Sequence, residues 1–142
     1  MRLSARARYG SRAMLDLALH FGQGPVSLRE VCERQEVSES YMENLMAPLR
    51  HSGLVRTERG RHGGYALARN PAQITLGDIV RALDGPLEPV HCVNSPDECD
   101  RSAECVTRLM WEGLKDAADG YLDSVTLADM AEMKESRTEE SR

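Results

Sequence analysis

Residues 27–67 read SLREVCERQEVSESYMENLMAPLRHSGLVRTERGRHGGYAL, and this stretch decides the fold of the chain. Ser27 and Glu30 form the S-x-x-E pattern of a capping box, which marks the start of one helix. Ser38 is a favourable first residue for a second helix, and only a short turn at 35–37 separates the two. Two helices joined by such a turn are typical of a helix-turn-helix motif.

Two short strand-like runs follow the second helix, LVRT at 54–57 and YALA at 65–68. The segment between them, ERGRHGG, is basic and rich in glycine, which is typical of the tip of a β-hairpin. A hairpin placed directly after a helix-turn-helix motif is a wing. We therefore expect a mainly α fold with a small β-hairpin, a winged helix-turn-helix.

Helical periodicity continues on both sides of this stretch. Ser4 can cap a first helix that runs to about Phe21, and 74–83 reads as a further helix with Thr75 as its cap. A long helix is expected from about Cys105 to Tyr121, with Trp111 as a packing anchor. A short helix at 127–133 and a disordered polar tail complete the chain, and no internal repeat is evident. The expected organisation is a DNA-binding domain at 1–86, a cysteine-rich loop at 87–104, a dimerisation helix with the closing short helix at 105–133 and the tail at 134–142.

The charges are segregated along the chain, although the net charge of −5 at first argues against nucleic acid. Residues 1–70 hold 11 Arg and 7 acidic residues, a net of +4, whereas residues 71–142 carry a net of −9. This distribution indicates that only the first half approaches phosphate, unless solvated charges have segregated by chance. All cations of the first half are Arg, which favours bidentate contacts with phosphate and guanine.

Other classes of protein fit the sequence poorly. The chain contains no long apolar run, so no membrane span is expected, and its start, MRLSARARYG, lacks the apolar core of a signal peptide. Both observations predict a cytoplasmic protein. No paired carboxylates, Ser-His-Asp set or phosphate-binding loop is evident, so we do not expect an enzyme.

The second helix of the motif is the candidate recognition helix. Its first turns carry polar side chains of the kind that reach bases or phosphates, and the helix dipole there favours a phosphate. Asn44 can read adenine, and Glu43 can accept a hydrogen bond from cytosine or repel a wrong sequence. The alternative is a helical domain whose polar face is merely solvated. The candidate DNA-binding residues are Ser38, Ser40, Tyr41, Glu43 and Asn44 on the helix, and Arg59, Arg61 and His62 on the wing.

Three of the four cysteines lie in the segment HCVNSPDECDRSAEC, at positions 92, 99 and 105. Thiolates gathered in this way in a cytoplasmic chain select zinc, copper(I) or an iron–sulphur cluster. The spacing is wider than that of zinc knuckles, which places a cluster first, zinc second and thiol redox sensing third. Cys32 lies near Val31 in the first helix of the motif and is expected to be a buried small hydrophobe.

The whole chain, from residue 1 to about 133, resembles the IscR/NsrR/RirA family of iron–sulphur regulators, and the IscR branch most of all. The matching segments are MRLSARARYGSRAMLDLAL, CERQEVSESYMENL, GLVRTERGRHGGYAL, the three-cysteine loop, the Trp-containing helix and VTLADM. The resemblance implies a homodimer built on the long helix that reads pseudo-palindromic double-stranded DNA. It also implies that Cys92, Cys99 and Cys105 ligate the cluster, with 2Fe–2S ranked ahead of 4Fe–4S.

The fourth ligand departs from the family pattern. The IscR pattern has one residue fewer between the first two cysteines and a histidine three residues after the third, where this chain has Arg108. Some relatives take a cluster ligand from the first helix, but the corresponding positions of this chain are Arg8 and Arg12. The fourth ligand is therefore unassigned, and it comes from the partner subunit, from a small molecule, or from a set of loop candidates: His91, Asp97, Glu98, Asp100 and Glu104.

Our mechanistic hypothesis is that a bound cluster orders the loop at 88–104 against the long helix and the partner's first helix, and so sets the spacing of the two recognition helices. Two other functions stay open. One is a cluster-free winged-helix regulator that responds to thiol oxidation or to a metabolic partner enzyme, and the other is an iron–sulphur carrier or electron-transfer protein without a DNA role.

Overall fold

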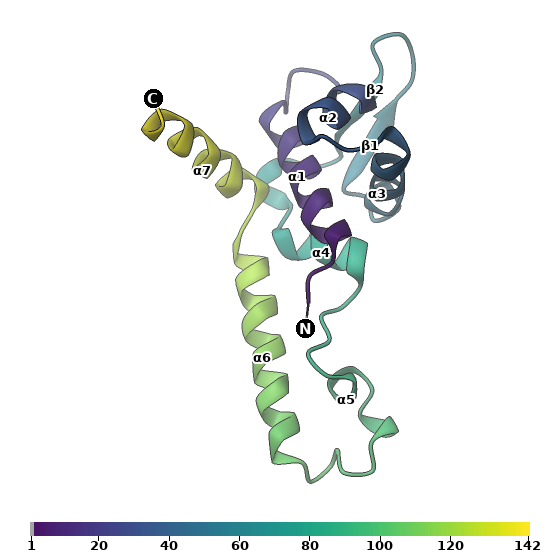
Figure 1. Cartoon of the computed structure of the whole chain (residues 1–142), viewed down its shortest axis with the longest axis vertical. Helices are drawn as coiled ribbons and strands as arrows, with labels where there is room; N and C mark the ends of the chain where they lie inside the picture. The colour runs from purple at the N-terminus through teal and green to yellow at the C-terminus, as the bar shows by residue number, and fades with distance from the viewer. Residues whose placement is uncertain (1) are drawn as a thin grey trace.

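A computed structural model describes residues 2–142 of the chain. The helices are α1 (Ala5–Leu19), α2 (Leu28–Gln35), α3 (Glu39–His51), α4 (Leu76–Asp84), α5 (His91–Asn94), α6 (Val106–Ser124) and α7 (Leu127–Glu140). Two strands, β1 (Val55–Glu58) and β2 (Gly64–Leu67), and two short 3₁₀ turns, η1 (Pro71–Gln73) and η2 (Pro96–Glu98), complete the order. The expected mainly α fold with one hairpin is confirmed (Figure 1).

The helix starts that we expected from the sequence are present. The hydroxyls of Ser4, Ser27 and Ser38 accept hydrogen bonds from the backbone N–H three residues onward, at 3.0, 3.2 and 3.1 Å. Thr75 forms a full capping box with Asp78, so α4 begins one residue later, at Leu76. These contacts satisfy N–H groups that a helix otherwise leaves unpaired.

The core lies where α1, α2, α3, α4 and the hairpin meet. Gly10 allows α1 and α4 to approach closely, because a Cβ atom at this position would lie 2.2 Å from a methyl group of Leu83. The buried side chains there come from every one of these elements, and Cys32 is buried among them as expected: Met14, Leu17, Val31, Met42, Leu45, Met46, Leu49, Leu54, Val55, Leu67, Ile74 and Ile79.

The wing is an antiparallel pair in which Val55 faces Leu67 and Glu58 faces Gly64. A third segment holds its base, because Val26 and Tyr65 exchange two backbone hydrogen bonds of 2.8 and 2.7 Å. Gly64 is required at this point, since a Cβ atom there would lie 2.1 Å from the carbonyl oxygen of Val26. The wing is therefore fixed to the end of the loop that precedes α2.

A short internal repeat joins α4 to the last two helices. We had expected no internal repeat from the sequence, so this expectation is corrected. Residues 74–79 read ITLGDI and residues 125–130 read VTLADM, and each segment caps its helix with a Thr–Asp box. The two segments lie antiparallel, with Thr75 opposite Thr126. Their backbones are joined by hydrogen bonds from Leu76 N–H to the Val125 carbonyl and from Leu127 N–H to the Ile74 carbonyl, at 2.8 and 2.9 Å. Ile74 thus belongs to this bridge and not to a helix.

Two further expectations about the second half are wrong. The chain from Lys134 is not disordered as far as Glu140, because α7 continues through it. Five of the seven residues in KESRTEE are Lys, Arg or Glu, which are good helix formers, and they follow a strong cap, so the helix continues. Trp111 is not buried as a packing anchor within the chain, because 41% of it is exposed.

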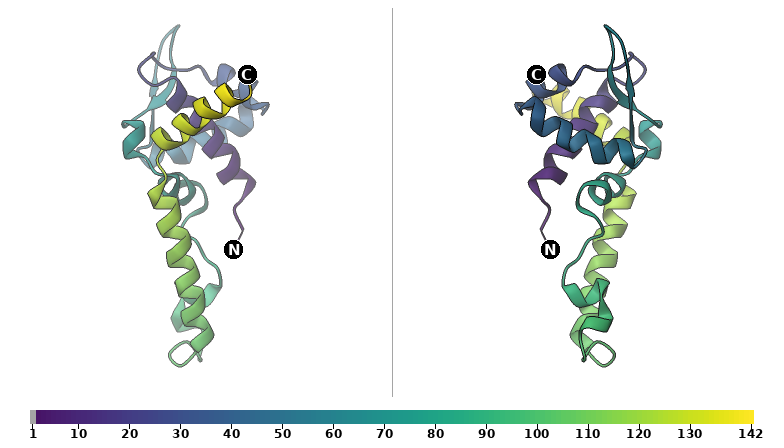
Figure 2. Two further views of the ribbon diagram at one scale, coloured as in Figure 1. Left: turned by 90° about the vertical axis from the view of Figure 1, so that its left-hand side faces the viewer. Right: turned by 90° about the vertical axis from the view of Figure 1, so that its right-hand side faces the viewer.

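The molecule is elongated. Helix α6 extends away from the winged domain, and the segment that contains α5 and η2 runs beside it (Figures 1 and 2). The wing and the cysteine loop therefore lie at opposite ends of the long axis. Within residues 2–142, no helix is both long enough and apolar enough to cross a lipid bilayer.

Candidate nucleic-acid interface and cysteine loop

Helix α3 presents a polar face to solvent. Ser38, Ser40, Glu43 and Asn44 are exposed on it, while Met42, Leu45, Met46 and Leu49 of the same helix are buried in the core. The turn before the helix is tight, because Glu36 adopts a left-handed conformation with φ of 56°. The hydroxyl of Ser38 is already engaged as the helix cap. The exposed side chains lie near the start of the helix, where a recognition helix contacts bases, and they stay candidates for DNA contact.

Tyr41 differs from the other candidates on α3. It is partly buried, and its ring packs edge-on against the ring of Tyr9 on α1, with centroids 5.9 Å apart and an interplanar angle of 87°. The guanidinium of Arg12 lies 5.3 Å from the centre of the Tyr9 ring. Tyr41 therefore links the recognition helix to α1 through aromatic and cation–π contacts.

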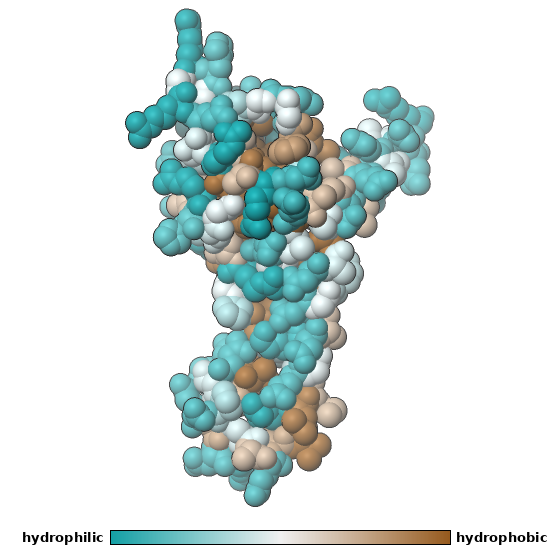
Figure 3. All heavy atoms as spheres, turned by 180° about the vertical axis from the view of Figure 1, so that it is seen from behind, coloured by the Kyte–Doolittle hydropathy of each residue, from teal (hydrophilic) through white to brown (hydrophobic). Residues whose placement is uncertain are grey.

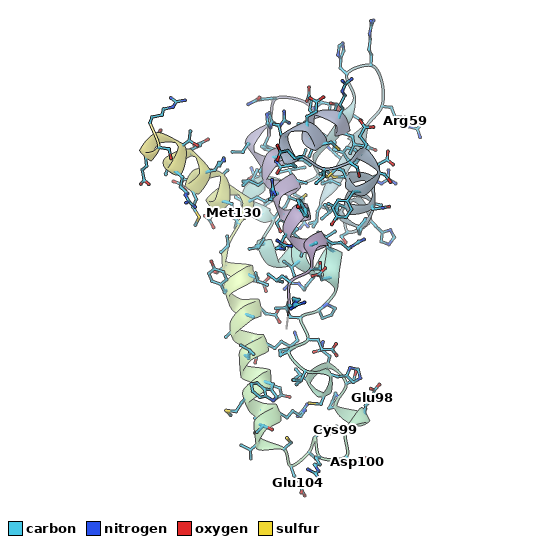
Figure 4. The ribbon with its side chains drawn as sticks, in the orientation of Figure 1. Arg59, Glu98, Cys99, Asp100, Glu104 and Met130 are labelled. Carbon is cyan, nitrogen blue, oxygen red and sulfur yellow. The ribbon has the colours of Figure 1, made fainter. Side chains whose placement is uncertain are left out.

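The tip of the wing carries the three basic candidates Arg59, Arg61 and His62, and all three are exposed. In Figure 4 Arg59 extends from the hairpin away from the body of the molecule. At the base of the hairpin Arg56 forms an ion pair with Glu58, so its charge is partly compensated. The tip is thus the part of the wing with uncompensated positive charge.

A buried ion pair that the sequence analysis missed holds α2 against α1. Asp16 is buried, with 4% of its surface exposed, and its carboxylate accepts two hydrogen bonds from Arg34 and one from Gln35. The hydrogen bonds to Asp16 raise the pKa of Arg34, so the guanidinium stays charged. The detectable signal was an acid inside the apolar run MLDLAL of α1.

The three loop cysteines lie on three different local structures. Cys92 is in α5, Cys99 directly follows η2, and Cys105 is the residue before the first turn of α6. All are free thiols; Cys99 is exposed and the other two are partly buried. Across residues 2–142, no three ligating side chains of His, Cys, Asp or Glu lie close enough to hold a metal ion. The structure thus places the thiols on one loop without gathering them.

Cys105 and Cys32 have opposite electrostatic surroundings. A hydrogen bond with Thr107 and the backbone N–H groups at the start of α6 lower the pKa of the Cys105 thiol. Burial and then the charges of nearby glutamates raise the pKa of the Cys32 thiol. Cys105 is therefore the thiol that is better prepared to act as a thiolate ligand or nucleophile.

The candidates for a fourth ligand are exposed at the far end of the molecule, and Figure 4 shows Glu98, Asp100 and Glu104 there beside Cys99. Asp97 is exposed as well. Among them His91 has its ring between Glu98 and Glu88, and these two hydrogen bonds raise its pKa. Both ring nitrogens of His91 are thus engaged, and one of them would have to exchange its carboxylate for the metal before His91 could act as a ligand.

Arg108 stands where the family pattern has a histidine, and the structure gives it a different role. Its Nε–H donates to the carbonyl oxygen of Cys92 at 3.2 Å, and its guanidinium pairs with Glu112 at 2.8 Å. Arg108 thereby holds α5 against α6. The donor set itself suits an iron–sulphur cluster, because three soft thiols occupy one short loop.

The fold, the polar recognition helix and the wing define a winged helix-turn-helix transcriptional regulator. The sequence model of the Rrf2 family, which is described as an iron-dependent transcriptional regulator, matches residues 3–133 of this chain. The chain belongs to the Rrf2 family.

Its relatives cover almost the whole chain. The regulator CymR of Bacillus subtilis is 40% identical over 131 residues, which span 92% of this chain and 90% of that protein. The regulator IscR of Serratia proteamaculans is 38% identical, over 92% of this chain and 79% of that protein. Among solved structures, T. potens IscR has a TM-score of 0.78 at 46% identity, and covers 94% of this chain and 88% of its own.

Proposed function

We propose that this chain is a homodimeric, cytoplasmic transcriptional regulator that binds pseudo-palindromic operator DNA and responds to the state of an iron–sulphur cluster. One observation carries the proposal: a winged domain and a loop with three free thiols occupy opposite ends of one elongated chain (Figure 4). The description of the family as iron-dependent supports it. Family membership among regulators disfavours a carrier without a DNA role.

A second copy of the chain is the proposed partner of α6. Large apolar side chains on this helix are exposed, among them Val106 at 68%, Met110 at 58% and Tyr121 at 67%. Figure 3 shows apolar surface at the end of the elongated part. Contiguous exposed apolar surface marks an interface. The long helix exposes this surface because its ion pairs with α4 are at Asp119 and Asp123, near its C-terminal end.

An apolar groove on the body offers the complementary surface. It has a volume of about 410 Å³ and is lined by residues of α1, α4, α6 and α7, including Tyr9, Val80, Leu122 and Met130. We propose that α6 of the partner covers this groove. A two-fold arrangement would then present two recognition helices to successive turns of DNA, about 34 Å apart.

Cys92, Cys99 and Cys105 would bind the cluster as thiolates, with 2Fe–2S ranked ahead of 4Fe–4S and the fourth ligand unassigned. When bound, such a cluster supplies a cross-link that is sensitive to oxidation and to iron supply. The three thiolates would draw α5, the end of η2 and the start of α6 together. An open fourth position suits a sensor, because its ligand is easily exchanged.

A hydrogen bond of Arg108 and ion pairs of Arg81 connect this loop to the winged domain. Arg108 holds α5 on α6, and Arg81 of α4 donates to Asp123 of α6 at 2.5 Å, with Asp119 at 3.7 Å. Closing the loop therefore shifts a helix that is fastened to α4. The proposed outcome is a change in the populations of two dimer arrangements with different operator affinity.

Anaerobic purification tests the cluster. Iron and sulphide are expected in stoichiometric amounts, with visible absorbance that Cys92→Ser removes and the matched variant Cys32→Ser retains. A colourless protein that contains zinc contradicts the cluster. The dimer is tested by light scattering: Met110→Glu is expected to give monomers, and Glu112→Gln on the same helix to leave the mass unchanged.

A cluster-free regulator that responds to thiol oxidation is the second candidate function. It is favoured by the ungathered cysteines and by the lowered pKa of Cys105. A Staphylococcus aureus CymR structure, 36% identical with a TM-score of 0.76, is described as an oxidized form. Iron-free protein would then change its DNA affinity on treatment with diamide, and Cys105→Ser would abolish the change.

A further inference from the structure

A second pocket lies away from the cysteine loop and adjoins the apolar groove on the body, with which it shares Arg12. It has a volume of about 490 Å³, within the range of small-molecule sites. Helices α1 and α2, which are neighbours in the sequence, and the distant helix α7 build it. Its lining combines the cationic side chains of Arg12, Arg34 and Lys134 with the apolar side chains of Leu15 and Leu19, and His20 also lines it.

The pocket carries more positive charge than its own acid compensates. Asp16 is the acid in the lining, and the two hydrogen bonds from Arg34 match its charge. Within residues 2–142, Arg12 donates to the neutral amide of Gln35, and Lys134 pairs with no carboxylate. Two cations thus face the pocket with their charge available, although the half of the chain that contains Lys134 is strongly acidic.

We propose that this pocket binds a small organic anion with a compact apolar body. Arg12 and Lys134 would pair with its phosphate or carboxylate group, because charge-assisted hydrogen bonds are the strongest available there. Leu15 and Leu19, both partly buried, would contact the body of the ligand. The ligand would bridge α1 and α7.

The pocket is connected to the recognition helix in two ways. Arg34 and Gln35 are the last residues of α2, directly before the left-handed Glu36 of the turn into α3. Arg12 also lies over the ring of Tyr9, which packs on Tyr41 of α3. An anion that draws Arg12 toward α7 therefore alters a contact of the recognition helix. This regulatory step, unlike the binding itself, rests on the proposed function.

Binding is measured without DNA, on the full chain with ¹³C-labelled leucine methyl groups. Phenyl phosphate is the probe and benzyl alcohol its uncharged counterpart, both at constant ionic strength. The expected result is saturable shifts of the Leu15 and Leu19 methyl signals with phenyl phosphate and none with benzyl alcohol. Shifts that do not saturate, or that are equal for both compounds, overturn the proposal.

Two exposed residues on one helix provide a matched pair of variants. Lys134→Gln is expected to weaken phenyl phosphate binding about threefold to tenfold, since it removes one charge-assisted contact. Arg137→Gln removes a positive charge three residues onward, outside the pocket, and is expected to change the affinity for phenyl phosphate less than twofold. Equal losses in both variants would indicate general attraction and overturn the site. Arg34 is left intact because Asp16 depends on it.

The regulatory step is tested by DNA affinity with and without phenyl phosphate at constant ionic strength. A change in the wild type that is absent in Lys134→Gln supports it, and no change in either overturns it. If Lys134→Gln lowers DNA affinity without any anion, the pocket is a contact for DNA phosphate and the proposal fails. A chain that binds phenyl phosphate but no DNA would refute the proposed function alone.

Discussion

Arg34, at the end of α2, donates two hydrogen bonds to the carboxylate of Asp16 on α1, at 2.9 and 2.8 Å, and that carboxylate is almost completely shielded from water. The pair fixes the supporting helix of the DNA-binding motif to the helix that lines the apolar groove. A charge this deeply buried is tolerated because its hydrogen bonds are complete.

Removal of this carboxylate is expected to destabilise the fold. Asp16→Ala leaves Arg34 and Gln35 without their acceptor, and we expect a loss of about 1–3 kcal/mol in the free energy of unfolding, less than for a fully buried pair because Arg34 is partly exposed. Urea denaturation measures it. The matched control is Glu33→Ala, which breaks an exposed pair with Arg29 and is expected to cost less than about 1 kcal/mol. Equal losses would contradict a special role for Asp16.

The capping box of α7 gives a second prediction. Thr126→Ala removes the hydroxyl that accepts from Asp129 N–H, and a loss of about 1 kcal/mol is expected. Thr138→Ala on the same helix serves as the control, since its hydroxyl only bonds a carbonyl one turn earlier. Circular dichroism during thermal unfolding separates the two. A Thr126→Ala protein as stable as the control would show that the bridge to α4 does not need the cap.

Thiol reactivity in the iron-free protein should follow the two opposite pKa shifts. At pH 7.5 Cys105 is expected to react with iodoacetamide faster than Cys32, because its lowered pKa leaves a larger thiolate fraction while Cys32 is buried and its pKa is raised. Thr107→Val should slow Cys105 specifically, and this effect should disappear as the pH rises above 9, where both variants are ionised. Peptide mass spectrometry reports the rates. Equal rates at Cys105 and Cys32 would refute the assignment.

The wing predicts a salt-dependent contribution to DNA binding. Arg59→Gln and Arg61→Gln should each weaken binding to all sequences and reduce the slope of log affinity against log salt by about 1, as expected for the loss of one phosphate contact. Asn44→Ala on α3 should instead relax discrimination at one base pair, at a cost of about 1–3 kcal/mol. Fluorescence anisotropy at several salt concentrations measures both. An unchanged slope in the two wing variants would place the tip outside the interface.

The local elements were predictable from the sequence because their causes are local. Ser4, Ser27, Ser38 and Thr75 each cap a backbone group three residues away, so the helix starts follow from residue order alone. The same holds for the wing. Helix α7 is longer than the helix that we expected at 127–133, and the cause is local too, since its charged residues extend a well-capped helix.

The tertiary structure decided the relations between distant segments. Thr75 meets Thr126, Asp16 meets Arg34, and Arg108 meets the backbone of Cys92, because packing brings together elements whose separation along the chain carries no signal of contact. It also determined that α6 leaves its apolar side exposed. The sequence by itself thus determined a winged helix-turn-helix and three thiols in one loop. How the winged domain and the cysteine loop are connected depended on which surfaces of the helices pack against one another. Such burial and long-range hydrogen bonds exist only once the chain has folded.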